Sequence, residues 1–303
     1  MKKLLLIDGN AILHRAWHAY PELTNPKGEH VNAVYGFFSM LFNVVMTQIP
    51  DYLVVCFDRP KPTHRQTLFA GYHANRGPLE EDFVRQIVRV HEILEQGKVT
   101  IFELDGYEAD DLLGTIAHKA VSKYNEEVVI VTGDRDLLQL VNPRVKILMP
   151  QGSLAKSVLF DEDMVLEKYG VHPRQFIDYK ALIGDQSDGY PGVTGIGPKT
   201  AAKLLQKFET FDNLYKSLPL VPDKIALKLA TDAEQAALAK VLATIMLDVP
   251  IQFDMQACHC GDFDVRKMRK AFREEGFTSL QAKLDTLFGK EEETAQLGLM
   301  DEK

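Results

Sequence analysis

The sequence predicts an α/β domain with a doubly wound, mostly parallel sheet, followed by a smaller helical region. Two observations support this prediction. Continuous apolar runs of strand length alternate with stretches of helical periodicity, as they do in βαβ units. Three of these runs are also followed by an aspartate, at the sheet edge where parallel strands end and ligands bind.

Five apolar runs predict the strands. The first, Leu4–Ile7, is followed directly by Asp8, and the second, Tyr52–Phe57, by Asp58. The fourth, Val128–Thr132, runs into Gly133-Asp134-Arg135-Asp136. The full set of expected strands is 4–7, 52–57, 99–104, 128–132 and 145–148.

Helical periodicity fills most of the intervals between the strands. Residues 79–96 carry one apolar stripe, and the helix that begins near Glu108 has a core-facing side from Leu113 onward. The expected helices are 12–17, 31–45, 79–96, one from Glu108 to about Tyr124, one from Pro198, and further helices within 220–248.

Composition places the chain among ordinary globular proteins. With 303 residues, 46% hydrophobic and 26% charged, it can bury a full core. The apolar runs are too short for a membrane span, and Asp8 interrupts the first run too early for a signal peptide. Three cysteines cannot build a disulfide framework, and Cys56 lies inside an apolar strand. We therefore expect a reducing, cytoplasmic location.

The net charge of −8 argues against a protein that coats nucleic acid non-specifically. The charges are nevertheless segregated, because no acid occurs between Asp58 and Glu80. A basic segment beside clustered acids suits a metal-dependent enzyme with a polyanionic substrate. The basic residues of this segment are Arg59, Lys61, Arg65 and Arg76.

The helix from Glu108 opens with three carboxylates in four positions, Glu108, Asp110 and Asp111. Acids in a first helical turn often only compensate the helix dipole, and one aspartate after a strand is usually a turn residue. Three strand-end aspartates and an acidic helix start converge on one sheet edge, however. We therefore favour a shared site.

Crowded carboxylates repel one another and need a cation between them, yet no basic residues are interleaved with these acids in the sequence. Hard divalent cations such as Mg²⁺ prefer oxygen ligands. A cluster of this size suits two ions roughly 4 Å apart and metal-assisted phosphodiester hydrolysis without a covalent intermediate. No phosphate-binding loop of the Gly-x-x-x-x-Gly-Lys type is present.

A glycine-rich stretch, residues 182–202, is the second informative segment. It holds Asp185 and Asp188, and its glycines allow backbone to approach a ligand closely. Pro198 suits the first turn of a helix whose N-terminus can bind phosphate. A plain helix–turn–helix joint with a solvated lysine face is the alternative, and a dinucleotide fold fails because no strand precedes the glycines. The remaining residues of interest are Gly192, Gly195, Gly197, Lys199, Thr200, Lys203 and Lys207.

Taken together, these motifs resemble the 5′-nuclease domain of bacterial DNA polymerases I, within the flap-endonuclease family, from Met1 to about Gly289. The matching motifs are Asp8-Gly9-Asn10 with His14-Arg15-Ala16, Phe57-Asp58, Tyr107-Glu108-Ala109-Asp110-Asp111, Thr132-Gly133-Asp134-Arg135-Asp136, and Gly184-Asp185-Gln186-Ser187-Asp188 before Pro191-Gly192-Val193.

The resemblance implies a PIN-like nuclease core over 1–180, a helical arch at about 59–96, and a helical duplex-binding region over 181–289. It also implies that residues 190–208 form a helix–three-turn–helix element, often with a K⁺ ion. Arg65, Tyr72, His73 and Arg76 fall on DNA-contacting arch positions. The implied ligands of two Mg²⁺ or Mn²⁺ ions are Asp8, Asp58, Glu108, Asp110, Asp111, Asp134, Asp136, Asp185 and Asp188.

By the same resemblance, the chain would act on branched or nicked duplex DNA with a 5′ flap, as a monomer in the bacterial nucleoid. Asp58 and Asp134 would act at the metals, and Arg15 and Arg76 would stabilise phosphate charge. The alternatives are a junction-binding protein without catalysis, which the complete carboxylate set disfavours, and a ribonuclease of the related fold. The long arch and the duplex-binding element disfavour the ribonuclease.

Two residues depart from the family pattern. The family commonly has lysine where this chain has His73, and a histidine is charged only part of the time near neutral pH. We expect slower turnover or a steeper pH dependence. The family usually has asparagine where this chain has Gly189, and we expect an effect on loop geometry only.

No polymerase or proofreading domain fits beyond Gly289. The charged tail, 290–303, is expected to be disordered. It includes Gln296-Leu297-Gly298-Leu299-Met300, which resembles the peptide that docks bacterial proteins onto the sliding clamp. An apolar patch without function is the competing interpretation.

Overall fold

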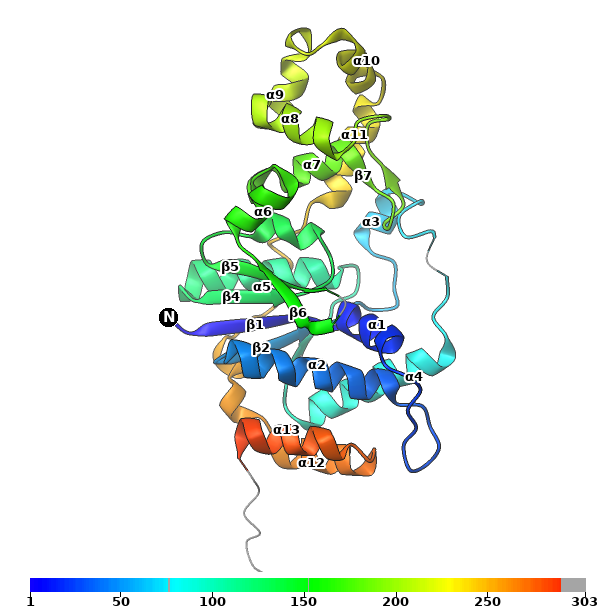
Figure 1. The fold of residues 1–303 in the computed structure, drawn as a ribbon, viewed down its shortest axis with the longest axis vertical. Coiled ribbons are helices and arrows are strands. Elements are labelled where there is room, and N and C mark those ends of the chain that lie inside the picture. The colour runs from blue at the N-terminus through cyan, green and yellow to red at the C-terminus, as the bar shows by residue number, and fades with distance from the viewer. Residues whose placement is uncertain (76, 152, 290–303) are drawn as a thin grey trace, which may run out of the picture.

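The computed structural model describes residues 1–75, 77–151 and 153–289, with backbone only for 151 and 153–156. A sheet flanked by helices forms the broad part of the molecule, and the α8–α10 helices lie at the far end of its long axis (Figure 1). Arg76 and the proposed clamp peptide, Gln296 to Met300, lie outside the described residues.

The main sheet has the order β3-β2-β1-β4-β5-β6. The first five strands are parallel, as expected, and β6 is antiparallel to β5. The sequence analysis did not predict β6. Only one residue separates it from β5, too few for a parallel crossover, so the pair forms a hairpin. The strands are β1 Lys3–Asp8, β2 Tyr52–Cys56, β3 Thr100–Phe102, β4 Glu127–Val131, β5 Val145–Gln151 and β6 Ser153–Phe160.

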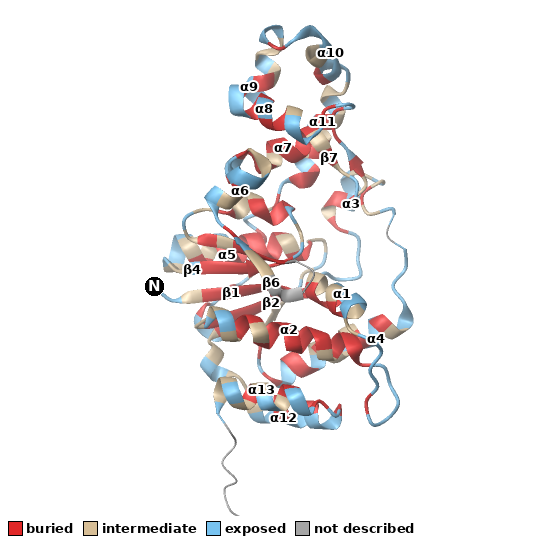
Figure 2. Ribbon diagram, in the orientation of Figure 1, coloured by how far each residue is buried: buried red, intermediate tan, exposed pale blue. Residues whose placement is uncertain are grey.

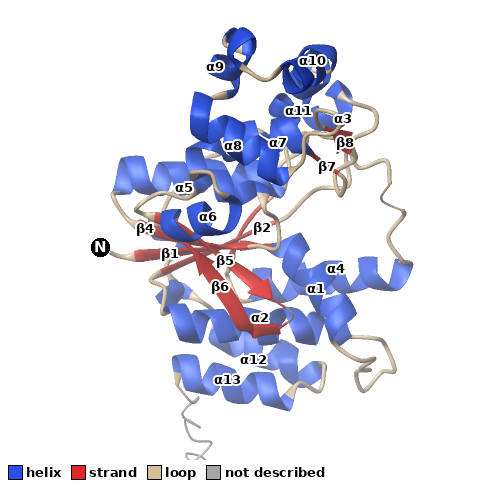
Figure 3. Cartoon of the chain, turned by 45° about the horizontal axis from the view of Figure 1, so that its top comes forward, coloured by secondary structure: helices blue, strands red, loops and turns tan. Residues whose placement is uncertain are grey.

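Helices cover both faces of this sheet (Figure 3). Successive residues of a strand point to opposite faces, so Leu5 and Ile7 pack among α1, α2, α4, α12 and α13, whereas Leu4 and Leu6 pack with α5. The central strands β1, β2 and β4 and most of α2 are buried (Figure 2). These helices are α1 Gly9–Ala19, α2 Asn32–Gln48, α4 Glu81–Gln96, α5 Ala109–Tyr124, α12 Val265–Glu274 and α13 Thr278–Phe288.

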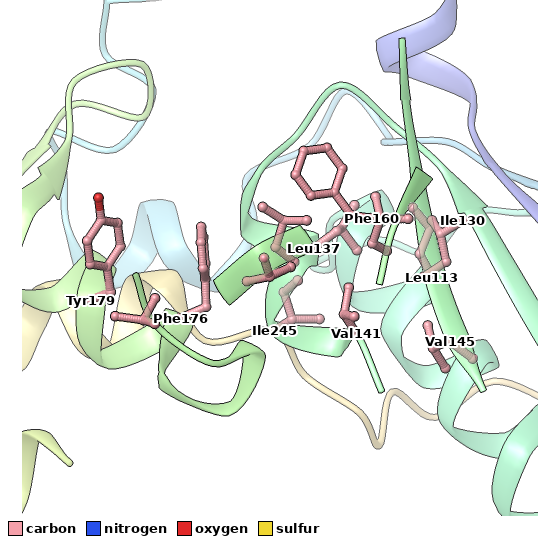
Figure 4. Packing of buried hydrophobic residues seen from close by; sticks show 14 of the residues in the cluster. Leu113, Ile130, Leu137, Val141, Val145, Phe160, Phe176, Tyr179 and Ile245 are labelled. Carbon is pink, nitrogen blue, oxygen red and sulfur yellow. The ribbon is translucent and has the colours of Figure 1, made fainter. Parts of the chain in front are cut away.

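The helical region continues the α5 side of the core. Leu113 of α5 and Ile130 of β4 belong to the same apolar cluster as Phe176 and Tyr179, with Ile245 between them (Figure 4). A two-stranded ribbon, β7 Gly184–Asp185 with β8 Tyr190–Pro191, projects from this region. Its helices are α6 Glu162–Tyr169, α7 Phe176–Ile183, α8 Pro198–Phe208, α9 Phe211–Lys216, α10 Asp223–Thr231 and α11 Ala233–Ala243. Short 3₁₀ turns span Asp136–Leu140, Pro173–Gln175, Leu218–Leu220, Gln256–Cys258 and Cys260–Asp262.

The predicted arch contains a short helix, α3 His64–Leu68, before α4. Beyond α3 the chain packs on the helical region, where Tyr72 shares a small apolar cluster with Tyr190 and Leu242. Among the described residues, no helix combines the length and apolar character needed to cross a membrane.

Candidate metal centre and nucleic-acid interface

The ends of β1 and β2 position two carboxylates at one edge of the sheet. Asp8 is the last residue of β1 and caps α1, accepting the Ala11 N–H at 2.9 Å and the Thr132 hydroxyl at 2.7 Å. Asp58 follows β2 and accepts the N–H of Ala109 at 2.7 Å, at the start of α5. The first turn of α5 is thereby held beside the strand ends.

Asp8, Asp58, Asp110 and Asp134 form what we call the first carboxylate group. Burial, followed by the charges of Asp58 and Asp134, raises the pKa of Asp8 to about 7. The pKa of Asp110 is also raised well above its usual range, by burial and then by the charges of the other three members. The group therefore carries closely spaced negative charge that a bound cation would relieve.

Asp136, Asp185 and Asp188 form the second carboxylate group, with one oxygen from each within 4.8 Å of the others. Asp136 begins the 3₁₀ turn after β4, and the other two come from the β7–β8 ribbon. The two groups are neighbours, because the Asp136 N–H donates to Asp134 at 2.8 Å and the charge of Asp188 raises the pKa of Asp134, after burial.

Backbone contacts shape the turn that presents the second group. Asp185 accepts the N–H groups of Ser187, at 2.7 Å, and Asp188, at 3.3 Å. Gly184 has φ +73° and ψ −175°, a conformation essentially limited to glycine. A Cβ there would lie 2.2 Å from the Gly192 nitrogen. The ribbon therefore closes only because Gly184 in β7 and Gly192 just after β8 both lack a Cβ.

Glu108 and Asp111, two further members of the expected ligand set, have partners within the protein, and the charge of Glu108 also acts on Asp110 of the first group. Asp111 is fully buried and its two oxygens accept from the Arg65 guanidinium at 2.7 and 2.8 Å. Glu108 accepts from Arg65 at 3.0 Å, from the Thr63 hydroxyl at 2.7 Å and from the Tyr72 hydroxyl at 3.0 Å. Both carboxylates therefore accept from protein donors in this structure, and their role as metal ligands stays a proposal.

Arg65 and Tyr72 accordingly have structural roles, and DNA contact by either stays a proposal. Arg65 is 2% exposed and also donates to the Leu242 and Thr244 carbonyls, both at 2.8 Å. It thus joins the arch, α5 and the C-terminal end of α11. The basic character of the arch is further reduced where Arg59 and Lys61 pair with Asp105.

The two departures from the family pattern meet in space. His73 has φ +57°, its N–H donates to the Asp188 carbonyl at 2.9 Å, and its Nε2 lies 3.0 Å from Asp188 Oδ1. Gly189 has φ +81°, and a Cβ on it would lie 2.6 Å from the Gly71 carbonyl oxygen. The expectation of a purely local loop effect at Gly189 is therefore incomplete, because glycine permits the arch to approach.

The glycine-rich loop leads into α8 as expected. Gly192 is buried, Gly195 has φ +72°, and Gly197 caps the helix before Pro198. The helix side that carries Lys199 and Lys203 is exposed, with Thr200 half-buried beside them. An exposed helix N-terminus with lysines on its first turns is suited to bind phosphate.

Arg15 lies on α1, half-buried, and its guanidinium donates to the Pro150 carbonyl at 3.2 Å, where β5 ends. It therefore lies near the same edge of the sheet as Asp8. The other proposed phosphate ligand, Arg76, has no described placement.

Lys180 is a functional candidate that sequence reasoning missed. It lies on α7, 5% exposed, between Asp136 and Asp185 of the second group. No basic residue is interleaved with these acids in the sequence, but Lys180 and Arg65 reach acids of the expected ligand set from other elements. A lysine within the apolar helix Phe176–Ile183 was the available signal.

Comparison with protein families decides the affiliation of the chain. Residues 3–170 match the model described as "5'-3' exonuclease, N-terminal resolvase-like domain", and residues 171–266 match "5'-3' exonuclease, C-terminal SAM fold". The chain belongs to the 5′-3′ exonuclease family.

Curated relatives of this 5′-3′ exonuclease family member are longer proteins. DNA polymerase I of Bacillus subtilis strain 168 is 37% identical over 284 residues, which cover 93% of this chain and 32% of the relative. The thermostable DNA polymerase I of Thermus thermophilus is 40% identical over 254 residues, which cover 84% of this chain and 30% of the relative. The chain thus spans about a third of the length of these relatives.

Solved structures share the fold at low identity. The bacteriophage T5 D15 flap endonuclease, in a pseudo-enzyme-product complex with DNA and metal ions, superposes with a TM-score of 0.68 at 19% identity, over 94% of this chain and 98% of that one. The catalytic core of Rad2 in complex with DNA substrate has a TM-score of 0.58 at 15% identity, over 94% of this chain and 90% of that one. These likenesses establish the α/β fold with its helical region.

The donor chemistry of this exonuclease-family site fits divalent cations. Both carboxylate groups offer carboxylate oxygens, the ligands that Mg²⁺ and Mn²⁺ prefer. The raised pKa of Asp136, about 8 through burial and the neighbouring Asp134, reflects negative charge that a cation would compensate.

Proposed function

We propose that this chain is a structure-specific 5′ nuclease that hydrolyses DNA phosphodiesters near the junction of a 5′ flap or at a nick. The observation that supports this most directly is the pair of carboxylate groups at one sheet edge, adjacent to the arch and the β7–β8 ribbon. The 5′-3′ exonuclease family to which the chain belongs supports the same reaction class.

The first group would hold one divalent ion and the second group another, with Mg²⁺ or Mn²⁺ as the proposed metals. When bound, the ions would supply Lewis-acid activation and compensate negative charge on the scissile phosphate. Asp58 and Asp134 would orient the first site, and Arg15 with Arg76 would contact the phosphate. The relatives with bound DNA and metal ions support this assignment by analogy.

The duplex would dock on the loop and helix that contain Gly192, Gly195, Gly197, Lys199, Thr200 and Lys203. Backbone N–H groups and lysine charge would hold phosphates there without reading sequence. A K⁺ ion at this loop, a monomeric state and a division between 180 and 181 remain proposals. So do clamp docking through Gln296 to Met300 and a cytoplasmic, nucleoid-associated location.

The test of this function is cleavage of a 5′-flap duplex labelled at the flap. We expect cleavage near the junction with Mg²⁺, none with EDTA, and a rate roughly 10³-fold lower for Asp134→Ala, since this residue joins both carboxylate groups. Asp248→Ala is the matched control, because Asp248 is an exposed aspartate outside both groups.

Three outcomes would contradict this proposal. Tight flap binding without cleavage in Mg²⁺ or Mn²⁺ would favour a junction-binding protein. Selective cleavage of single-stranded RNA would favour a ribonuclease of the related fold. Equal loss in Asp134→Ala and Asp248→Ala would separate the activity from the carboxylate groups.

His73→Lys tests the departure in the arch. We expect faster turnover and a flatter pH profile than in the wild type, because a lysine keeps its charge between about pH 6 and 8. Single-turnover flap cleavage across this range is the measurement, with His172→Lys as a surface histidine control outside the arch. Identical rates and profiles for His73→Lys and wild type would contradict the prediction.

A further inference from the structure

The second carboxylate group contains its own cation. The Lys180 ammonium lies 2.5 Å from Asp136 Oδ1 and also contacts Asp185 Oδ2. Its side chain is 7% exposed and passes beside the Tyr190 ring, with Nζ 6.0 Å from the ring centroid. The lysine is therefore held among the acids and is not a solvent-exposed neighbour of them.

In the first carboxylate group, Asp8 and Asp134 accept hydrogen bonds from uncharged donors. Asp8 accepts from an N–H and from a hydroxyl, and Asp134 accepts from an N–H. In the second group, by contrast, two carboxylates share one ammonium, so the charge there is already partly neutralised. The two groups thus offer a divalent cation unequal electrostatic fields.

We propose that Lys180 is a built-in counter-ion of the second carboxylate group. It holds Asp136 and Asp185 together when no divalent cation is present, and it competes with the cation for the same oxygens. This inference rests on the proposed function and adds an order of filling: the first group takes its ion at lower metal concentration than the second. Lys180 is a positioning residue, since it acts through the carboxylates.

Mn²⁺ binding to the whole chain, followed by electron paramagnetic resonance of free Mn²⁺ without DNA, tests the proposal. In Lys180→Met we expect the weaker Mn²⁺ site to bind about tenfold more tightly or better, because the ammonium charge that opposes the ion is gone. In EDTA the same variant should melt at a lower temperature than the wild type, because the carboxylates of the second group then repel one another. Mn²⁺ should raise the melting temperature of the variant by more than it raises that of the wild type.

Lys240→Met is the matched control. Lys240 also bridges two aspartates, Asp178 at 3.0 Å and Asp212 at 3.3 Å, but away from both carboxylate groups. Its removal should leave Mn²⁺ affinity unchanged. Lys180→Gln provides a second variant, which removes the charge and keeps an amide donor, and it should shift Mn²⁺ affinity in the same direction.

Unchanged or weaker Mn²⁺ binding in folded Lys180→Met and Lys180→Gln would overturn the inference. If both variants are unfolded in EDTA, recovery of the fold in excess Mn²⁺ supports it, and failure to recover refutes it. A wild type that binds no Mn²⁺ would instead refute the proposed function. The two failures are therefore distinguishable.

Discussion

Without divalent metal, Arg65→Met is expected to reduce the free energy of unfolding by about 3–5 kcal/mol. Asp111 is fully buried and depends on this guanidinium, and Glu108 shares it. Removing the cation leaves a buried carboxylate without its partner and frees two backbone carbonyls at the C-terminal end of α11. Urea unfolding in EDTA measures the effect, and flap cleavage should fall as the arch loses its anchor.

Arg59→Met is the matched control for this prediction. Arg59 is also an arch arginine paired with two acids, Glu103 and Asp105, but its side chain is 40% exposed. Solvent screens such pairs, so its unfolding midpoint should change little. The double variant Arg65→Met with Asp111→Asn should regain part of the stability. Equal midpoints for Arg65→Met and Arg59→Met would show that the buried pair contributes nothing specific.

Gly184→Ala is expected to lower the free energy of unfolding by about 3 kcal/mol or more, or to prevent folding of the ribbon. The new Cβ would lie 2.2 Å from the Gly192 nitrogen and 2.8 Å from the Tyr190 oxygen, both backbone atoms that no rotamer change can move. Because this ribbon presents Asp185 and Asp188, Mn²⁺ binding at the second group should be lost as well.

Gly77→Ala is the comparison for Gly184→Ala. A Cβ at Gly77 meets nothing within 4 Å and its φ is not positive, so the substitution should change stability by less than about 1 kcal/mol. Thermal unfolding by circular dichroism compares the two variants. Similar melting temperatures for both would mean that the ribbon tolerates a wider separation of its strands.

The sheet and the first carboxylate group follow from local sequence patterns. Buried strands are continuous apolar runs in the sequence, and Asp8, Asp58 and Asp134 lie at the ends of three of them or shortly beyond. Five parallel strands and the acidic helix start were predicted on this basis. The α3 helix was missed because it has only five residues, fewer than two helical turns.

Ion pairs between distant residues could not be predicted in the same way. Arg65 meets Asp111 across 46 positions, and Lys180 reaches Asp136 from another element. Spacing along the chain carries no information about such partners, so the sequence did not show that Glu108 and Asp111 share Arg65. A charged residue on an otherwise apolar helix indicates that a buried partner exists, without identifying it.

The contact between Gly189 and the Gly71 carbonyl makes the arch and the ribbon a matched pair. A side chain at position 189 would push the arch backbone away and carry His73 off Asp188. Chimeras that exchange only the arch, or only the ribbon, with a relative that has asparagine at position 189 would therefore misalign both. We expect functional grafts to require that the two segments be transplanted together.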